Sequence, residues 1–218
     1  MNKPLLQVRS LSLGFARQDP AGGETRITDA LSAISFQLHA GETLALLGES
    51  GCGKSLTALA LMRLLPPQAR FQAGHVLLSA ASEGRAEDLL RVSEDRMRQI
   101  RGSRIAMIFQ EPATSLNPVM RIGEQISEVL RLHRGLSKAD YDQEVLALLA
   151  QVGLPDPVRA AAAYPFELSG GMKQRAMIAM ALAGNSEILL ADEPTTALDV
   201  TLQAQILDLI RELQQQRQ

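Results

Sequence analysis

The chain has 218 residues, a formal net charge of −2 and 46% hydrophobic residues, which is enough for one large domain, or a domain with a subdomain, around a real core. Its nearly balanced charge argues against a nucleic-acid-binding domain, which usually carries a clear excess of lysine and arginine. The single cysteine, Cys52, excludes an internal disulfide and fits a reducing cytoplasm. No signal peptide and no run of about 18 apolar residues is predicted, so we expect an intracellular protein that does not itself span a membrane.

The first third of the chain predicts strands and one helix. Residues 5–15 and 31–38 alternate apolar and polar side chains as strands do, and residues 41–50 predict a short buried strand that leads into a glycine-rich turn. The leucines and alanines after Lys54 predict a helix. We expect this helix to end at Pro66, because two successive prolines forbid helical hydrogen bonding.

Strands and helices alternate further along the chain. Residues 71–80 predict more sheet, and residues 93–102 predict a short, strongly charged helix. Residues 104–109 form a compact apolar run that predicts a strand ending at Gln110, and residues 187–192 predict another strand. This order indicates an α/β core.

The middle of the chain is helical in character. Residues 121–133 and 138–153 repeat apolar side chains at three- and four-residue spacing, as surface helices do. Ser137 and Asp140 form a weak capping box at the start of the second helix. These helices, followed by another at residues 170–184, predict a helical subdomain inserted in the α/β core. The last helix has an apolar face made by Leu202, Ile206, Leu209, Ile210 and Leu213.

The turn at residues 48–55 matches the phosphate-loop pattern G-x-x-x-x-G-K-[ST]. Its glycines allow successive N–H groups to point at anionic oxygens, and the following helix directs its positive dipole end to the same place. Lys54 supplies a positive charge for the β- and γ-phosphates, and the Ser55 hydroxyl is a ligand for Mg²⁺. A plain glycine-rich connector is the alternative, but chance gives this pattern on the order of once in a few hundred chains of this length.

The segment at residues 188–194 is an apolar strand that ends in Asp192 and is followed by Glu193. Asp192 is placed to orient Mg²⁺ or its water, and Glu193 is placed to polarise an attacking water. Many strands end in an acidic turn, so this signal is weak without the phosphate loop upstream.

A second possible anion site precedes the helix at residues 170–184. Ser169, Gly170 and Gly171 form a backbone nest, although such a triplet is usually an ordinary loop. With this element the chain resembles the ATP-binding cassette (ABC) family, whose members carry all three motifs in this order. "LSGG" at residues 168–171 resembles the signature sequence, "GESGCGKS" the Walker A motif and "ILLADE" the Walker B motif. Gln110 matches the Q-loop glutamine and Asp199 the D-loop aspartate.

The resemblance covers essentially the whole chain and implies the fold. It implies an α/β P-loop NTPase of ABC type, with a mostly parallel core sheet, an antiparallel β subdomain and an inserted α-helical subdomain. We expect one domain over residues 1–218. Residues 1–110 and 185–218 would form the nucleotide-binding core with the β subdomain, and residues 111–184 the helical subdomain that carries the signature.

The resemblance also implies roles for individual residues, with ATP and Mg²⁺ as cofactors. Glu193, Gln110 and Lys54 would be catalytic, and Ser55, Gln110 and Asp192 would hold the metal ion. Phe15 would stack on adenine, with a plain core phenylalanine as the alternative. ATP would be bound by Phe15, Gly48, Glu49, Ser50, Gly51, Cys52, Gly53, Lys54, Ser55 and Leu56. In a head-to-tail pair, the ATP of the partner cassette would be contacted by Leu168, Ser169, Gly170, Gly171, Met172 and Asp199.

The family implies a motor subunit of an ABC importer that binds and hydrolyses ATP on the inner face of the cell membrane. Its partners would be integral membrane permease subunits and a second ABC ATPase, identical or paralogous, with a periplasmic or extracellular solute-binding protein involved indirectly and no nucleic acid. "IFQEPATSLNP", "YPFELSGGMKQR" and "ADEPTTALDVTLQAQIL" are most similar to the ATPases of oligopeptide, dipeptide, nickel and related importers. "LRLHRGL" is similar to members that serve microcin-type or oligopeptide uptake. The transported substrate is chosen by other subunits.

One departure from the family leaves alternatives open. Family members continue into a strand that ends in a switch histidine, whereas His39, His75 and His133 all lie upstream and are expected to be surface or packing residues. We therefore expect a cassette truncated at its C-terminus, or the first piece of a longer protein, that binds ATP and whose turnover is in doubt. The alternatives are a non-catalytic nucleotide-binding fragment and a soluble ABC ATPase that acts on nucleic acid or ribosomes.

Overall fold

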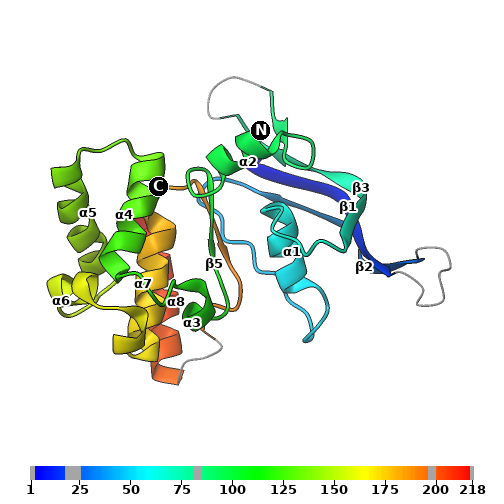
Figure 1. Ribbon diagram of the computed structural model, residues 1–218. Coiled ribbons are helices and arrows are strands. Elements are labelled where there is room, and N and C mark those ends of the chain that lie inside the picture. Colours follow the sequence, from blue (N-terminus) through cyan, green and yellow to red (C-terminus); the bar gives the residue numbers. More distant parts are fainter. Residues whose placement is uncertain (1–2, 18–25, 81–84, 196–199, 217–218) are drawn as a thin grey trace. The chain divides into compact units, whose positions relative to one another are not determined.

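The computed structural model describes residues 3–17, 26–80, 85–195 and 200–216 (Figure 1). The chain divides into two compact units, one ending at Met97 and the other beginning at Arg98. This division by compactness differs from the functional division at residues 110/111 and 184/185, which stays a prediction.

The first unit is built on a four-stranded antiparallel sheet of order β2-β1-β3-β4. Its strands have the bounds β1 Leu6–Arg17, β2 Arg26–Leu38, β3 Ala69–Leu78 and β4 Glu87–Asp88. The central strand β1 pairs with β2 on one side and with β3 on the other, so that Val8 lies opposite both Phe36 and Val76. The strands expected at residues 5–15, 31–38 and 71–80 are therefore confirmed.

The buried positions of β1 switch from even to odd residue numbers, and this switch explains a bulge in the sheet. Leu6 and Val8 are buried at even positions, whereas Leu11 and Leu13 are buried at odd positions. In a strand with period two, one extra residue is needed to keep both pairs on the same face. The register of β1 shifts between Val8 and Leu11, where Ser10 has a φ of 47°. The bulge therefore keeps four apolar side chains in the core.

Helix α1 (Lys54–Leu61) belongs to the same unit and lies beside the sheet (Figure 1). It ends before Pro66, earlier than expected, because Arg63 takes a φ of 51° that no right-handed helix can contain. The Arg63 guanidinium then donates hydrogen bonds to the carbonyl oxygens of Leu89 (3.3 Å) and Val92 (2.7 Å). The end of α1 is thereby tied to the loop after β4.

The strand expected at residues 41–50 is wrong. The segment forms no strand, and Leu44, Leu46 and Leu47 are exposed, Leu47 to 92%. A strand requires a neighbour that accepts and donates its backbone hydrogen bonds. No described strand pairs with this segment, so its apolar composition does not produce a buried strand.

The second unit contains a two-stranded parallel sheet and a group of helices. Strand β5 (Ile105–Ile108) is buried along its whole length and pairs in parallel with β6 (Ile188–Ala191). At the start of both strands, Arg104 forms a bidentate ion pair with Glu187, with Nε donating to Oε1 at 2.6 Å and Nη2 donating to Oε2 at 2.8 Å. The strands expected at residues 104–109 and 187–192 are confirmed, and they are the described parallel part of this α/β fold.

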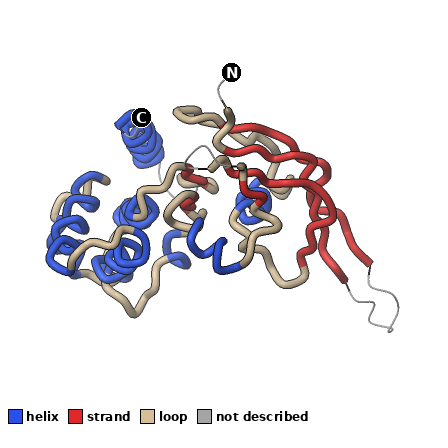
Figure 2. The backbone as a smooth tube through the Cα atoms, turned by 90° about the horizontal axis from the view of Figure 1, so that it is seen from above, coloured by secondary structure: helices blue, strands red, loops and turns tan. Residues whose placement is uncertain are grey.

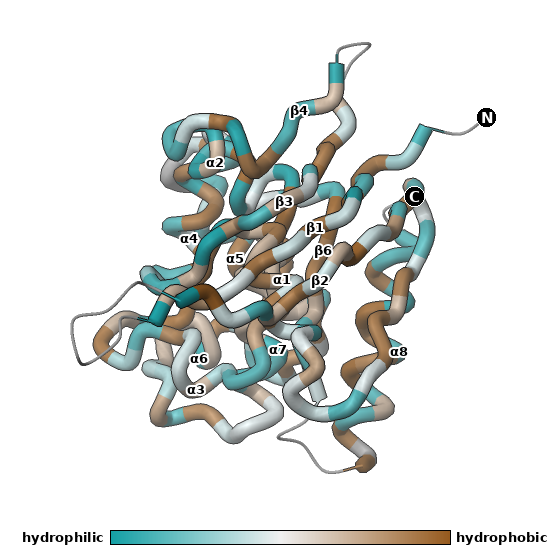
Figure 3. Tube along the Cα trace, turned by 90° about the vertical axis from the view of Figure 1, so that its right-hand side faces the viewer, coloured by the Kyte–Doolittle hydropathy of each residue, from teal (hydrophilic) through white to brown (hydrophobic). Residues whose placement is uncertain are grey.

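The helices that follow β5 gather around one apolar core (Figure 2). Leu130, Leu149, Met177 and Ile178 are completely buried in it. The Ser137–Asp140 capping box is present: the Ser137 amide donates to the Asp140 carboxylate at 3.3 Å. In Figure 3, apolar and polar residues alternate along the last helix, as expected for an amphipathic helix. The helices have the bounds α2 Glu94–Ile100, α3 Pro112–Ser115, α4 Ile122–His133, α5 Lys138–Gln151, α6 Pro157–Ala162, α7 Gly170–Ala183 and α8 Val200–Gln216, with a 3₁₀ turn at Pro165–Glu167.

A close backbone contact fixes the C-terminal end of α7 in the second unit. A Cβ atom added to Gly184, the residue after the helix, would lie 1.8 Å from the carbonyl oxygen of Gly102. Only glycine allows this approach. The half-buried His133 packs against Gly102 from α4, which agrees with its expected packing role. In the described part of the chain, no helix is long and apolar enough to cross a bilayer.

A carboxylate in the first unit makes stability depend on pH. Burial alone would raise the pKa of Asp88, but hydrogen bonds from His75 and from the amides of Val76 and Leu90 lower it below its ordinary value of 3.8. A lowered pKa stabilises the fold above the unfolded-state value, and this stability is lost as the pH falls through the folded-state value. We expect Asp88→Asn to reduce the free energy of unfolding by about 1–3 kcal/mol at pH 7, measured by urea denaturation.

The difference between Asp88→Asn and the unsubstituted chain should shrink as the pH falls from 3.8 through the lower folded-state pKa of Asp88, because the wild-type carboxylate is progressively protonated over this range. Asp208→Asn is the control: Asp208 pairs only with the exposed Arg211 among the ion pairs of the described residues, and its loss should have little effect. An equal loss in both variants, or a loss that does not change with pH, would contradict the assignment.

Candidate functional site

The loop at residues 48–55 has the backbone geometry that the phosphate-loop pattern predicts. Gly51 and Gly53 have φ values of 80° and 100°, and Gly53 is the N-cap of α1. A Cβ atom added to Gly53 would lie 2.6 Å from Cδ2 of Leu31 on β2. Position 53 therefore requires glycine for two reasons, its left-handed conformation and its contact with the sheet.

Lys54 folds back over this loop. Its Nζ donates hydrogen bonds to the carbonyl oxygens of Gly48 and Glu49, both at 2.9 Å. The helical ladder begins with the Thr57 amide, which donates to the Gly53 carbonyl at 2.8 Å. The N–H groups of residues 54–56 lie ahead of that ladder, at the positive end of the helix dipole. A lysine, several amides and a dipole at one place are suited to an anion.

The rest of this loop is open to solvent. Ser55, the second residue of α1, and Leu56 are half-buried, whereas residues 48–52 are exposed. The exposed set includes Glu49, Ser50 and the single thiol, Cys52, whose amide donates to the Glu49 carbonyl at 3.3 Å.

In the second unit, the parallel register of β5 and β6 brings polar residues together. Ile108 lies opposite Ala191, so the residues that follow both strands emerge at one edge of the sheet. There the amide Nε2 of Gln110 donates to Oε2 of Glu193 at 2.9 Å. The Asp192 amide donates to the Ile108 carbonyl at 3.0 Å, and Glu193 has a φ of 44°. Sequence reasoning selected these residues without predicting that Gln110 and Glu193 are in contact.

The donors at this edge suit magnesium. Asp192 and Glu193 supply carboxylates and Gln110 supplies an amide oxygen, all of which are hard oxygen ligands. No group of three histidine, cysteine, aspartate or glutamate residues that could hold a metal occurs among the described residues. Magnesium fits such a sparse set, because it keeps several waters and usually binds through one or two carboxylates and the phosphates of a substrate.

The signature residues lie at the N-terminal end of α7. Ser169 is the N-cap, and its hydroxyl accepts a hydrogen bond from the Met172 amide at 3.4 Å. Gly170 is exposed and has open space where a Cβ would be, while Leu168 is buried and anchors the turn. A Cβ on Gly171 would lie 3.2 Å from the Leu202 side chain on α8. Asp199 lies outside the described residues.

Phe15 is half-buried in β1, opposite Thr28 on β2 and Ala69 on β3. This placement agrees equally with a stacking residue and with a core residue, so the stacking role stays a prediction.

Sequence reasoning missed a buried polar side chain next to the acidic strand. Gln174 on α7 is only 2% exposed, and its Nε2 donates to the Pro194 carbonyl at 2.6 Å. The signal was present in the sequence: Gln174 lies on the helix among positions that are otherwise apolar and buried. An uncharged polar side chain at such a position needs a hydrogen-bond partner.

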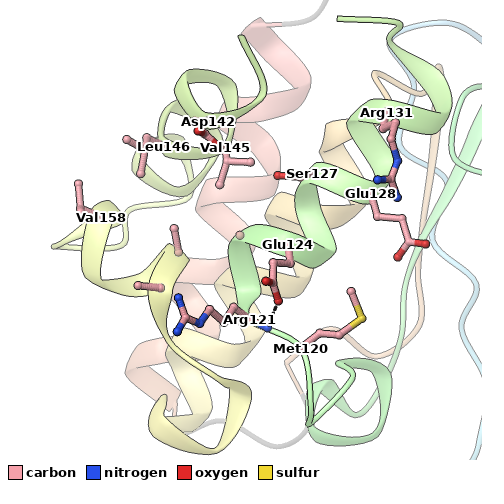
Figure 4. A pocket seen from close by; sticks show the side chains of 13 residues that line it. Met120, Arg121, Glu124, Ser127, Glu128, Arg131, Asp142, Val145, Leu146 and Val158 are labelled. Carbon is pink, nitrogen blue, oxygen red and sulfur yellow. Dashed lines mark hydrogen bonds between the residues drawn. The ribbon is translucent and has the colours of Figure 1, made fainter. Parts of the chain in front are cut away.

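A hollow on the helical side of the second unit has a volume of about 530 Å³. Figure 4 shows that its walls come from α4, α5 and α6, with Arg121, Glu124, Glu128 and Arg131 along one side. The opposite wall includes the apolar Val145, Leu146 and Val158 and the charged Asp142. The hollow contains none of the predicted nucleotide residues.

Comparisons with known proteins find a matching family and similar relatives. The family described as ABC transporter matches residues 31–196. The oligopeptide transport ATP-binding protein OppD of Bacillus subtilis is 49% identical over 211 residues, which cover 96% of this chain and 56% of OppD. The dipeptide transport ATP-binding protein DppD of the same organism is 47% identical over 96% of this chain and 59% of DppD. The chain also spans 61% of the length of a relative from Brucella ovis that is 51% identical.

Among solved structures, a dimeric post-hydrolysis state of the ATP-binding cassette MJ0796 bound to ADP and Pi is similar, with a TM-score of 0.79 and 28% identity. The match covers 97% of this chain and 83% of that one. The protein cbiO1 of Clostridium perfringens, part of the ABC transporter complex cbiONQ, shares the fold, with a TM-score of 0.72, over 99% of this chain and 75% of its own.

The double constraint on position 53 can be tested. We expect Gly53→Ala to weaken ATP binding by about 10-fold or more, because a methyl group must displace Leu31 and force the loop out of shape. The measurement is titration with a fluorescent ATP analogue, together with the melting temperature. Gly135→Ala is the matched control, since Gly135 also has a positive φ, 57°, but open space around it. Equal ATP affinities in the two variants would contradict the role of Gly53.

Proposed function

This chain belongs to the ABC transporter family, and we propose that it is the ATP-hydrolysing subunit of an importer of peptides or related small solutes. The observation that carries the proposal is the loop at residues 48–55, where Lys54 folds back onto the carbonyl oxygens of Gly48 and Glu49 and the left-handed Gly53 caps the N-terminal end of α1. Relatives that are about half identical are named as peptide transport ATP-binding proteins, which supports the class of solute.

The residues divide the chemistry among them. Lys54 and the amides of the loop bind the β- and γ-phosphates of ATP. The Ser55 hydroxyl, Asp192 and Gln110 would hold Mg²⁺, whose positive charge would offset the negative charge of the phosphate oxygens. Glu193 accepts a proton from the attacking water, which adds to the γ-phosphorus as the bond to the β-phosphate oxygen breaks.

In this proposal the signature serves a partner cassette. Ser169, Gly170 and Gly171 contact the γ-phosphate bound by a second ABC ATPase, so that ATP holds two cassettes together until it is hydrolysed. The N-cap geometry of Ser169 and the open space at Gly170 support this, since they leave amides at the start of α7 accessible to an anion. The similar cassette MJ0796 is dimeric, which supports the pairing.

We place the permease contact at the hollow bounded by α4, α5 and α6. Its mixed wall of apolar and charged side chains resembles the surfaces that bind a short amphipathic segment of a partner. The occupant we propose is a cytoplasmic segment of an integral membrane subunit, which would place the protein at the inner face of the membrane.

Substitution of the proposed base and substitution of the phosphate-binding lysine should affect different steps, hydrolysis and ATP binding. We expect Glu193→Gln to slow kcat by about 10²–10⁴-fold while ATP still binds, because a positioned general base contributes that much. Lys54→Ala should instead weaken the binding of ATP, since it removes the positive charge from the loop. Steady-state ATPase rates and a binding titration measure the two effects.

Two outcomes would contradict the proposal for these residues or this function. Normal hydrolysis by Glu193→Gln would remove the base assignment. Hydrolysis that depends on added nucleic acid, or no hydrolysis by the unsubstituted protein, would favour the other classes considered, a soluble ABC ATPase and a non-catalytic nucleotide-binding fragment.

The proposed permease contact predicts a selective loss of assembly. Val158 lines the hollow and is 65% exposed, so a charge there should leave the fold intact. We expect Val158→Asp to reduce co-purification of the membrane subunits by about 10-fold or more, because an unpaired charge is costly in an interface. Leu132→Asp is the control, being 68% exposed and outside the lining of the hollow. Equal assembly of both variants would place the contact elsewhere.

A further inference from the structure

The backbone just after β6 is held by two side-chain amides. Gln174 on α7 donates to the Pro194 carbonyl at 2.6 Å, and Gln203 on α8 donates to the Thr195 carbonyl at 3.1 Å. Proline has no N–H group, so its carbonyl is the backbone group through which this residue can be held by a hydrogen bond. Gln174 is the more deeply buried of the two amides, at 2% exposure.

The residue before this proline is one whose conformation needs to be held. Glu193 has a φ of 44°, and the left-handed region costs a residue with a side chain about 1–2 kcal/mol. Such strain persists only where the surroundings fix the backbone on both sides. On one side, the Asp192 amide donates to the Ile108 carbonyl of β5 at 3.0 Å. On the other side, Gln174 holds the Pro194 carbonyl.

The direction of the Glu193 carboxylate follows from these two anchors. The chain is held at the peptide unit before Asp192 and at the one after Pro194, which restrains the direction of the Glu193 Cα–Cβ bond, and its carboxylate meets the Gln110 amide at 2.9 Å. A general base must be placed within hydrogen-bonding distance of its proton, and an error of about 1 Å is enough to cost 10²-fold in rate.

The burial of Gln174 indicates that its amide matters more than its volume. The other buried residues of α7 are alanines, methionine, isoleucine and leucine. An apolar side chain of the same size would fill the position without the cost of desolvating an amide. The hydrogen bond to Pro194 offsets that cost and accounts for a polar side chain at this buried position.

We propose that Gln174 is a positioning residue for hydrolysis, which holds Glu193 in its working direction through the Pro194 carbonyl. It thereby links α7, whose first turn carries the signature, to the base of the same chain. Ser169 and Gln174 are five residues apart on one helix, a rise of about 7 Å. Displacement of the signature end by a partner's nucleotide is therefore transmitted to Pro194 by a rigid element. The inference rests on the proposed base role of Glu193.

The test compares two buried glutamines in the full-length protein. Gln174→Met keeps the volume of the side chain and removes its donor. Gln125→Met is the matched control: Gln125 on α4 is 6% exposed, and its amide donates to the carbonyls of Asn117 and Met120, away from Glu193. The readouts are kcat and KM for ATP, the melting temperature, and hydrogen–deuterium exchange of the backbone amides of residues 188–195.

We expect Gln174→Met to lower kcat by about 10- to 100-fold while KM changes by less than about 3-fold, because the base is misplaced and the phosphate loop is intact. Exchange at residues 188–195 should accelerate in this variant and stay unchanged in Gln125→Met. Added to Glu193→Gln, the substitution should cause no further loss of rate, because the group it positions is already gone.

Equal losses of kcat in Gln174→Met and Gln125→Met, in step with their melting temperatures, would overturn the inference. Unchanged exchange at residues 188–195 would overturn it as well, and this readout applies even to a protein without turnover. Normal hydrolysis by Glu193→Gln would instead contradict the proposed base role of Glu193, which is a different result from a failure of the inference about Gln174. Should Gln174→Met not fold, Gln203→Met releases the neighbouring carbonyl from a half-buried position and is expected to lower kcat in the same direction.

Discussion

The chemistry of the second unit depends on the parallel pairing of two strands that are four residues long. Because Ile105–Ile108 and Ile188–Ala191 are in register, the residues that leave their ends, Gln110 and Asp192 with Glu193, meet at one edge. A slip of one residue would turn every side chain of β6 to the opposite face. The Arg104–Glu187 ion pair at the start of both strands, with its arginine only 11% exposed, opposes such a slip.

The first unit meets a different constraint, the close approach of a loop and a sheet. Gly53 touches Leu31, which is itself buried in β2, and its left-handed conformation brings the chain from the loop into α1. Arg63 fixes the other end of this short helix to the loop after β4. The eight-residue helix is therefore held at both ends, and its first amides keep one direction.

Much of this could be predicted from sequence, because periodic patterns report local structure. Strands β1–β3 follow from alternation, β5 and β6 from short apolar runs, and the long helices from three- and four-residue spacing. The error at residues 41–50 has a physical reason: apolar composition does not show whether a partner strand is present. The early end of α1 depends on one residue, Arg63, whose left-handed conformation is not predicted by any sequence pattern. The motifs identified Gln110 and Glu193 singly, whereas their contact and the support from Gln174 are tertiary and join residues far apart in the chain.

The Gly184–Gly102 contact fixes the C-terminal end of α7 and leaves its N-terminal end less restrained. At that end the backbones are so close that no side chain larger than hydrogen fits, so a tilt of the helix must pivot there. Ser169 lies 15 residues from the pivot and Gln174 lies 10 residues from it. On a straight helix, Pro194 would then feel about two-thirds of any displacement of the signature end. Under the proposed pairing of two cassettes, the position of Gln174 along α7 would set how much of a displacement at Ser169 reaches Pro194 and the neighbouring Glu193 carboxylate.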